Sequence, residues 1–98
     1  MIRVIYHWKI DPENMESFIE TWKRTTSNIH NTVPGARGSF MLQNENDASD
    51  IKTIARWDSL NDWKKFWQNS NPSQMESMHD LGKRVSVEVF NEIDDFTF

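Results

Sequence analysis

Residues 2–10 of the chain read Ile2-Arg3-Val4-Ile5-Tyr6-His7-Trp8-Lys9-Ile10. Every even-numbered position in this stretch is apolar or aromatic, and three of the four odd-numbered positions are charged or polar. An alternation with a period of two is typical of a β-strand with one buried face. Asp11-Pro12-Glu13 follow at once, and they suit the N-cap, the first position and the first turn of a helix. The stretch therefore predicts a strand that leads directly into a helix.

The predicted first helix extends to Pro34-Gly35, where the proline stops it. Residues 36–44 and 51–57 then predict the two strands of an antiparallel hairpin. The polar, acidic segment 45–50 between them predicts a solvated loop. A calcium site is not expected there, because the segment lacks the glycine and the final glutamate of an EF-hand. The apolar stripe of the helix is formed by Met15, Phe18, Ile19, Trp22, Thr25, Thr26 and Ile29.

The second half of the chain predicts more helix and a last strand. Ser59 and Asp62 resemble a capping box, and an apolar side with Leu60, Trp63, Phe66 and Trp67 follows. Residues 69–72 (Asn-Ser-Asn-Pro) predict an interruption, after which a short helical stretch runs to Gly82. Residues 83–93 predict the fourth strand, whose apolar positions are Val85, Val87, Val89 and Ile93.

The order of these elements is βαββαβ, which predicts one α+β domain of the ferredoxin-like type over residues 1–98. In such a fold, a four-stranded antiparallel sheet carries two helices on one face. The other face would present apolar side chains beside Arg56 and Glu88, a mixture too apolar for water. We therefore expect a homodimer that pairs these faces, whose apolar and aromatic members would be Ile5, His7, Ile54 and Phe90.

Composition excludes several classes of protein. The chain has 98 residues, a net charge of −4 and no cysteine, so disulfide scaffolds, thiolate metal sites and cysteine nucleophiles are excluded. It shows no long apolar run and no signal-peptide core, so we expect a cytoplasmic protein without a membrane contact. RNA-recognition modules share the βαββαβ order, but Arg37-Gly38-Ser39-Phe40 falls on the second strand and the net charge opposes phosphate binding, so we expect no nucleic-acid partner.

Several motifs in sequence order resemble the antibiotic-biosynthesis-monooxygenase (ABM) superfamily of dimeric α/β barrels. They are the strand that enters Ile10-Asp11-Pro12-Glu13, the turn Pro34-Gly35-Ala36-Arg37-Gly38-Ser39, the strand end Ile54-Ala55-Arg56-Trp57-Asp58-Ser59, and Asn61-Asp62-Trp63. The resemblance covers nearly the whole chain. It implies a pocket between helices and sheet, and a barrel closed by two subunits.

The resemblance also implies a function and its residues. Members include cofactor-independent monooxygenases that oxidise planar aromatic phenols, quinols or anthrone-like molecules without a metal. Trp57 matches the tryptophan in the pocket of the quinone-forming members, whereas Thr53 stands where they have asparagine. Met78, with His79 beside it, stands where they have an arginine. We expect Trp57, Thr53, Tyr6 and His79 to be catalytic, with substrate walls formed by Trp8, Trp63, Trp67, Met75 and Met78, which could equally be an aromatic core.

Two alternative functions stay open. Haem-degrading members carry a helix histidine that ligates iron after a helix tryptophan, and His79 after Trp67 resembles that pair, although Tyr6 stands at the strand position of their asparagine. The other alternative is a non-catalytic dimer that binds a small molecule. His7 is expected inside the barrel and His30 at the end of the first helix, and three such scattered histidines predict no zinc site.

Overall fold

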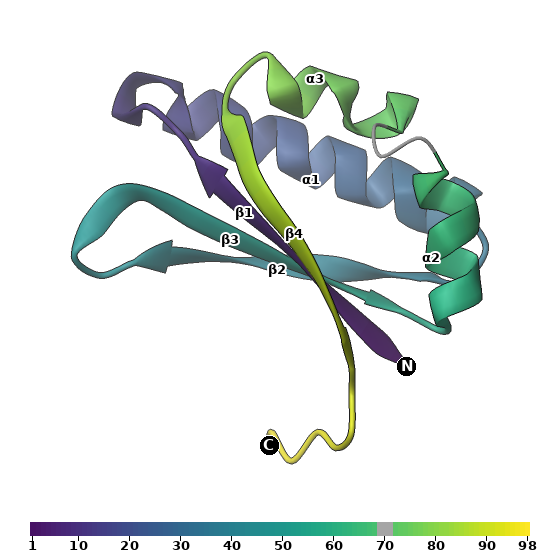
Figure 1. Cartoon of the computed structure of the whole chain (residues 1–98). Coiled ribbons are helices and arrows are strands. Elements are labelled where there is room, and N and C mark those ends of the chain that lie inside the picture. Colours follow the sequence, from purple (N-terminus) through teal and green to yellow (C-terminus); the bar gives the residue numbers. More distant parts are fainter. Residues whose placement is uncertain (69–71) are drawn as a thin grey trace.

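The computed structural model describes residues 1–68 and 72–98 of the chain. Four strands and three α-helices follow one another in the predicted order (Figure 1). Their bounds are β1 Ile2–Lys9, α1 Met15–Thr32, β2 Ala36–Asn44, β3 Asp47–Trp57, α2 Leu60–Trp67, α3 Glu76–His79 and β4 Lys83–Asn91. One-turn 3-10 helices, Pro12–Asn14 and Ser73–Met75, precede α1 and α3. The sequence predicts an interruption at residues 69–72. Residues 69–71 of this segment lie outside the described residues.

The four strands form one antiparallel sheet in the order β2-β3-β1-β4. This is the predicted ferredoxin-like topology. β1 lies in the centre, where Ile5 pairs with Ile54 of β3 and with Glu88 of β4. All three helices lie on one side of the sheet, and the other side is open (Figure 1).

The covered face of the sheet forms the core. The even-numbered residues Ile2, Val4, Tyr6 and Trp8 are all buried, which confirms the alternation of the first strand. Phe18 of α1 packs against Trp8, with ring centroids 5.2 Å apart. Large aromatic side chains therefore supply much of the burial, as the tryptophan content predicts.

The turn between α1 and β2 depends on Gly35. Its φ of +88° is one that other residues adopt only under strain, and a Cβ there would lie 2.5 Å from Oδ2 of Asp62. Asp62 belongs to the predicted cap of α2, because its backbone N–H donates to Oγ of Ser59 at 3.1 Å. The cap expected from Asp11 is different: Asp11 stands at the N-cap position, but its side chain makes no capping hydrogen bond.

The hairpin between β2 and β3 is tighter than predicted. β3 begins at Asp47 instead of residue 51, and only Glu45 and Asn46 form the turn. The side chain of Asn44 accepts from the N–H of Asn46 at 2.8 Å, and Asp47 accepts from the N–H of Ser49 at 3.0 Å. These local bonds satisfy backbone donors near the turn, so polar residues extend the strand where composition predicted a loop.

β4 also differs from its prediction. It ends at Asn91 instead of residue 93, and Ile93 is 94% exposed in the tail beyond it. A bulge opposite His7 and Trp8 places Arg84, and not Val85, beside Trp8. Val85 and Val89 remain largely exposed because β4 is the edge strand. The simple alternation was therefore wrong for both ends of this strand.

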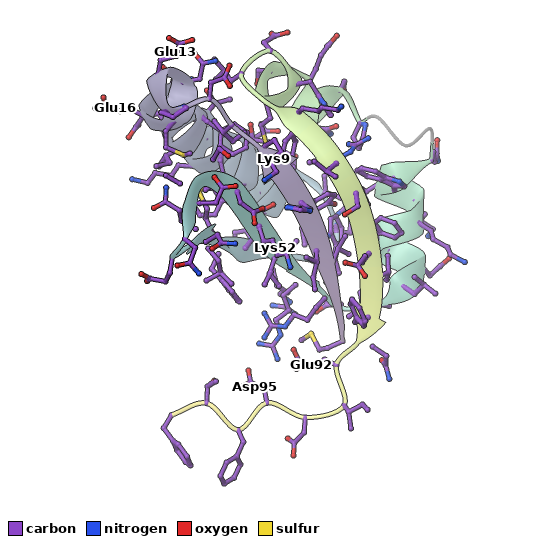
Figure 2. The ribbon with its side chains drawn as sticks, turned by 60° about the vertical axis from the view of Figure 1, so that its left-hand side comes forward. Lys9, Glu13, Glu16, Lys52, Glu92 and Asp95 are labelled. Atoms are coloured by element: carbon purple, nitrogen blue, oxygen red, sulfur yellow. The ribbon has the colours of Figure 1, made fainter. Side chains whose placement is uncertain are left out.

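The open face of the sheet mixes apolar and charged side chains. Phe40, Leu42 and Phe90 are each about half exposed there. Lys9 and Lys52 lie toward one end of this face, and Glu92 lies toward the other, where the chain leaves the sheet for its extended tail with Asp95 (Figure 2). Glu92 accepts from Nε of Arg3 at 2.6 Å and from Arg56 at 3.0 Å. Within the described part of the chain, every helix is too short or too polar to cross a membrane.

Candidate functional site

A cavity lies on the covered side of the sheet, between α1, the sheet, and the helices of the second half. α1 forms one wall, and the strands β1, β2 and β3 form the floor. Phe66 of α2, together with Met75 and Met78, encloses it from the other side. The remaining wall residues are Tyr6, Trp22, Thr25, Thr26, Ile29, His30, Ala36, Gly38, Ser39, Thr53, Ala55, Arg56 and Trp57.

The cavity is narrow and mostly apolar. The volume open to the centre of a water molecule is about 50 Å³, within an envelope of about 470 Å³ that includes space open to solvent. One water needs roughly 10–15 Å³ by the first measure, so about four waters fill the cavity. They occupy roughly 120 Å³ of liquid, which matches a single substituted aromatic ring.

Trp57 stands at the end of β3 and forms part of the cavity wall. Its side chain is buried, and its ring centroid lies 5.2 Å from that of Phe66 in α2. In β3 it lies opposite Ile2 of β1 and Ala36 of β2, so both neighbouring strands hold its backbone. A rigid aromatic surface of this kind can orient a planar ligand by stacking.

Tyr6 supplies a hydroxyl that the core holds in its neutral form. It is buried, and its oxygen accepts a hydrogen bond of 3.2 Å from the indole Nε1 of Trp63. Burial raises the pKa of Tyr6 to about 12, and the Trp63 hydrogen bond and Arg84 lower it by less. Because the indole already occupies one lone pair of the oxygen, the phenolic proton remains available to donate.

Two more hydroxyls of the cavity wall are arranged in the same way. The indole Nε1 of Trp8 donates to Oγ1 of Thr53 at 3.2 Å, and that of Trp22 donates to Oγ of Ser39 at 3.0 Å. An indole N–H can only donate, so each hydroxyl oxygen is an acceptor in its pair. The hydroxyl of Thr53 keeps its own proton for a further partner, whereas Oγ of Ser39 also lies 3.4 Å from Oγ1 of Thr26. Three indole–hydroxyl pairs therefore surround one cavity.

The sequence-predicted residues divide into two groups. Tyr6, Thr53 and Trp57 lie together on the wall, joined by Met75 and Met78. Trp8 and Trp63 stand behind the wall as donors to its hydroxyls. Trp67 stacks on Trp63, with centroids 5.4 Å apart, and His79 lies 5.4 Å from the ring of Trp8; neither of these two forms part of the wall.

His79 is held by its neighbours in a way that does not fit a haem ligand. Nη1 of Arg84 lies 3.3 Å from Nε2 of His79, and because a guanidinium only donates, Nε2 is the acceptor. Burial and the charge of Arg84 both lower the pKa of His79, so the ring is neutral. The Nε2 lone pair is occupied by the donor from Arg84, and His79 is not part of the cavity wall. The residues present do not form a haem site.

His30 is a wall residue that the sequence interpretation passed over. Its Nδ1 lies 2.9 Å from the carbonyl oxygen of Ala36, across the turn from α1 into β2. One feature of the sequence indicates that His30 lies near the site: it closely precedes the Pro34-Gly35 turn, where the helix and the next strand must converge. Over the described residues 1–68 and 72–98, no three His, Cys, Asp or Glu side chains gather to hold a metal ion.

Comparison with models of known protein families assigns this chain to a family. The family model for antibiotic biosynthesis monooxygenase matches residues 1–75, which include the strands β1 to β3 and most of the cavity wall. The chain belongs to the antibiotic biosynthesis monooxygenase (ABM) family. No curated protein matches the chain in sequence.

Solved structures resemble this ABM chain over nearly its whole length. An asparagine-to-alanine variant of SnoaB, a cofactor-independent oxygenase from Streptomyces nogalater, superposes with a TM-score of 0.74 at 13% identity, over 97% of this chain and 95% of that one. A proposed antibiotic biosynthesis monooxygenase from Deinococcus radiodurans gives a TM-score of 0.76 at 7% identity, over 100% and 98%. One from Chloroflexus aurantiacus gives 0.72 at 17%, over 98% and 96%. Identities this low establish the shared fold alone.

Proposed function

We propose that this ABM-family chain is a cofactor-independent monooxygenase that converts a planar aromatic phenol, quinol or anthrone-like molecule to a quinone. The observation that carries the proposal is the set of three indole–hydroxyl pairs around one apolar cavity. Such a cavity binds a flat apolar ring and offers hydrogen-bond donors to an oxygen that becomes negative. SnoaB, which shares the fold, is described as an oxygenase of this cofactor-independent kind.

The proposed reaction needs only the substrate and dioxygen. A phenol with a free para carbon loses its O–H proton, and the electron pair of the phenolate is shared with that carbon. The carbon reduces dioxygen and forms a C–O bond to it, which gives a hydroperoxide. Loss of the ring C–H proton and cleavage of the O–O bond then release one water and leave the quinone. One oxygen atom enters the product and the other leaves as water, so no external reductant is consumed.

The wall residues take distinct parts in this proposal. Trp57 stacks on the ring and orients it, while Met75 and Met78 close the opposite side. Tyr6 and Thr53 donate to the phenolate oxygen, since their own oxygens already accept from Trp63 and Trp8. Two donors that are fixed before the reaction stabilise the anion without reorganisation. The cavity volume favours a single-ring phenol over a fused tricycle.

The proposed working form is a homodimer. Phe40, Leu42 and Phe90 leave apolar surface on the open face of the sheet, the first two on the edge strand β2 and the third on the opposite edge strand β4. A second copy that presents the same face would cover them, as expected of an isologous contact. The cavity lies on the other side of the sheet, so the dimer contact leaves it accessible.

Oxygen uptake tests the proposed function. Purified protein is mixed with phenol, 1-naphthol or anthrone, and dioxygen consumption is followed beside quinone absorbance. Protein-dependent uptake with quinone formation is the expected result, with the single-ring substrate the most efficient. Tight binding of the same probes without uptake would contradict catalysis and would favour the non-catalytic binding protein.

A further inference from the structure

The cavity needs a group that accepts the substrate proton, and its wall offers few choices. Among the described wall residues, the titratable side chains are Tyr6, His30 and Arg56. Tyr6 is a neutral phenol with its proton in place, and the guanidinium of Arg56 has no lone pair to accept a proton and donates to Glu92 on the open face of the sheet. His30 is the wall residue whose side chain offers a nitrogen lone pair to a proton.

The hydrogen bond of His30 decides which nitrogen can react. The carbonyl oxygen of Ala36 has no proton to give, so at 2.9 Å Nδ1 of His30 must carry the proton and donate it. In the neutral imidazole the lone pair then belongs to Nε2. This hydrogen bond sets the tautomer of His30. It also holds the ring in position, because Ala36 is the first residue of β2 and is itself buried.

The backbone around this contact is held from several sides. His30 belongs to the last turn of α1, and the N–H of Val33 closes that turn on the carbonyl of Ile29 at 2.9 Å. The N–H of Ala36 returns to the carbonyl of Val33 at 3.3 Å. On the other side of the turn, the N–H of Asp58 donates to the carbonyl of Gly35 at 2.9 Å. The imidazole therefore stands on a fixed corner between α1 and β2, at the exposed rim of the cavity.

We propose that His30 is the general base of the reaction, and this inference rests on the proposed function. Nε2 takes the O–H proton of the bound phenol and the imidazole becomes an imidazolium, whose Nδ1–H stays on the Ala36 carbonyl. The negative charge remains on the substrate oxygen, which accepts hydrogen bonds from the hydroxyls of the indole–hydroxyl pairs. The imidazolium gives this proton to the peroxide oxygen formed on the para carbon, which yields the hydroperoxide. Nε2 then takes the ring C–H proton and passes it to the oxygen that departs when the O–O bond breaks, so that this oxygen leaves as water. The base is then ready for the next turnover.

Two substitutions at this position separate catalysis from structure. His30→Gln can still donate to the Ala36 carbonyl but is no base, so we expect kcat to fall roughly 100-fold with KM little changed. His30→Ala opens the site, and added imidazole should restore part of kcat, which a merely structural role would not allow. Asn31→Gln changes an exposed residue of the same helical turn and serves as the matched control. Retention of kcat in His30→Gln within about threefold of wild type would overturn the inference.

A second measurement keeps the inference testable if no probe is oxidised. 4-Nitrophenol is a single-ring phenol that dioxygen does not attack, and its phenolate absorbs visible light. At a pH where the free molecule is mostly protonated, we expect it to bind as phenolate to the wild type and to Asn31→Gln, and as phenol to His30→Gln. Equal spectra in all three proteins would overturn the assignment of His30 as the base. If the spectra differ as expected but no probe substrate consumes oxygen, only the proposed oxygenase activity is refuted.

Discussion

The indole Nε1 of Trp63 donates to the phenol oxygen of Tyr6 at 3.2 Å, and this bond joins α2 to the central strand β1 through the core. Both partners are buried, so each satisfies a polar group that water cannot reach. Tyr6 is also the one tyrosine of the chain, which makes its ionisation directly observable.

Tyr6 should therefore titrate late. Its pKa is raised by burial from 10.0 to about 12, so the unfolded chain loses the phenolic proton first as the pH rises. The free energy of unfolding should fall by about 1.4 kcal/mol per pH unit across that interval, in addition to the effect of other groups. The tyrosinate absorbance of the native protein measures the midpoint. A midpoint near 10 in the folded protein would contradict the burial argument.

Tyr6→Phe supplies the matched stability experiment. It leaves the buried N–H of Trp63 without its acceptor, which should cost about 1–3 kcal/mol at neutral pH. The same variant should lose the extra decline of stability above pH 10, because no group with a raised pKa remains at this position. Denaturant unfolding at several pH values measures both effects. If the free energy of unfolding falls with pH as steeply in the variant as in the wild type, the decline belongs to groups other than Tyr6.

Gly35 and Gly38 form a natural pair for a second stability prediction. Both have a positive φ, +88° and +92°, so alanine at either site should cost about 1–2 kcal/mol of backbone strain. Only at Gly35 would the new Cβ meet Asp62, whereas nothing lies within 4 Å at Gly38. Gly35→Ala should therefore cost about 1 kcal/mol more, because it displaces the Ser59–Asp62 cap of α2. Equal losses in chemical denaturation would contradict this account.

His79 should stay neutral on mild acidification and should not bind haem. Burial and Arg84 lower its pKa below 6.5, so the unfolded chain binds a proton first as the pH falls, and stability decreases there. NMR titration of the ring should give a midpoint below 6.5, and Arg84→Met should raise it. Addition of haemin should produce no Soret shift that depends on His79. A stoichiometric shift lost in His79→Ala would restore the haem alternative.

Charge on the open sheet face should dissociate the proposed dimer. Phe40 is 47% exposed on the edge strand β2 and lies opposite Ile54 in the register of the hairpin, so Phe40→Glu places a carboxylate on that face. Light scattering should give two chains of 11.7 kDa for the wild type and one for this variant. Leu60→Glu alters a comparably exposed residue on the helical side and should leave the dimer intact. A monomeric wild type would refute the contact.

Trp57 and Thr53 should affect turnover differently. Trp57→Phe keeps an aromatic ring but loses the larger stacking surface, so KM should rise and kcat should fall about tenfold. Thr53→Val keeps the shape and removes the donor to the phenolate, so kcat should fall roughly 100-fold with KM unchanged. Both variants should keep the oligomeric state of the wild type. Full oxygen uptake in both would remove these residues from the mechanism.

The fold could be predicted because its signals are local and consistent. The alternation in β1, the Pro34-Gly35 stop and the Ser59 cap each correspond to one element of the structure. The bulge beside Trp8 could not be predicted, because it arises from the pairing of β1 with β4, and so the pairing of Arg84 in place of Val85 with Trp8 was missed. The extension of β3 to Asp47 depends on side-chain bonds to the backbone that composition does not show.

Sequence spacing predicted the wall residues that lie on strands, and it also predicted Met75 and Met78 from the helical segments of the second half. Tyr6, Thr53 and Trp57 share the covered face because their spacing on β1 and β3 demands it. The contacts of His30 with Ala36 and of His79 with Arg84 depend on where helices end in space, so sequence spacing did not indicate that His30 lines the cavity wall.

The three indole–hydroxyl pairs also bear on how a turnover ends. Among the described residues, the wall around them carries donors but no carboxylate, so it would hold an anionic ring more strongly than an uncharged one. In the proposed reaction the phenolate is anionic and the quinone is neutral. Affinity would then fall as the chemistry finishes, and the product would leave a narrow cavity without any hinge or lid having to open.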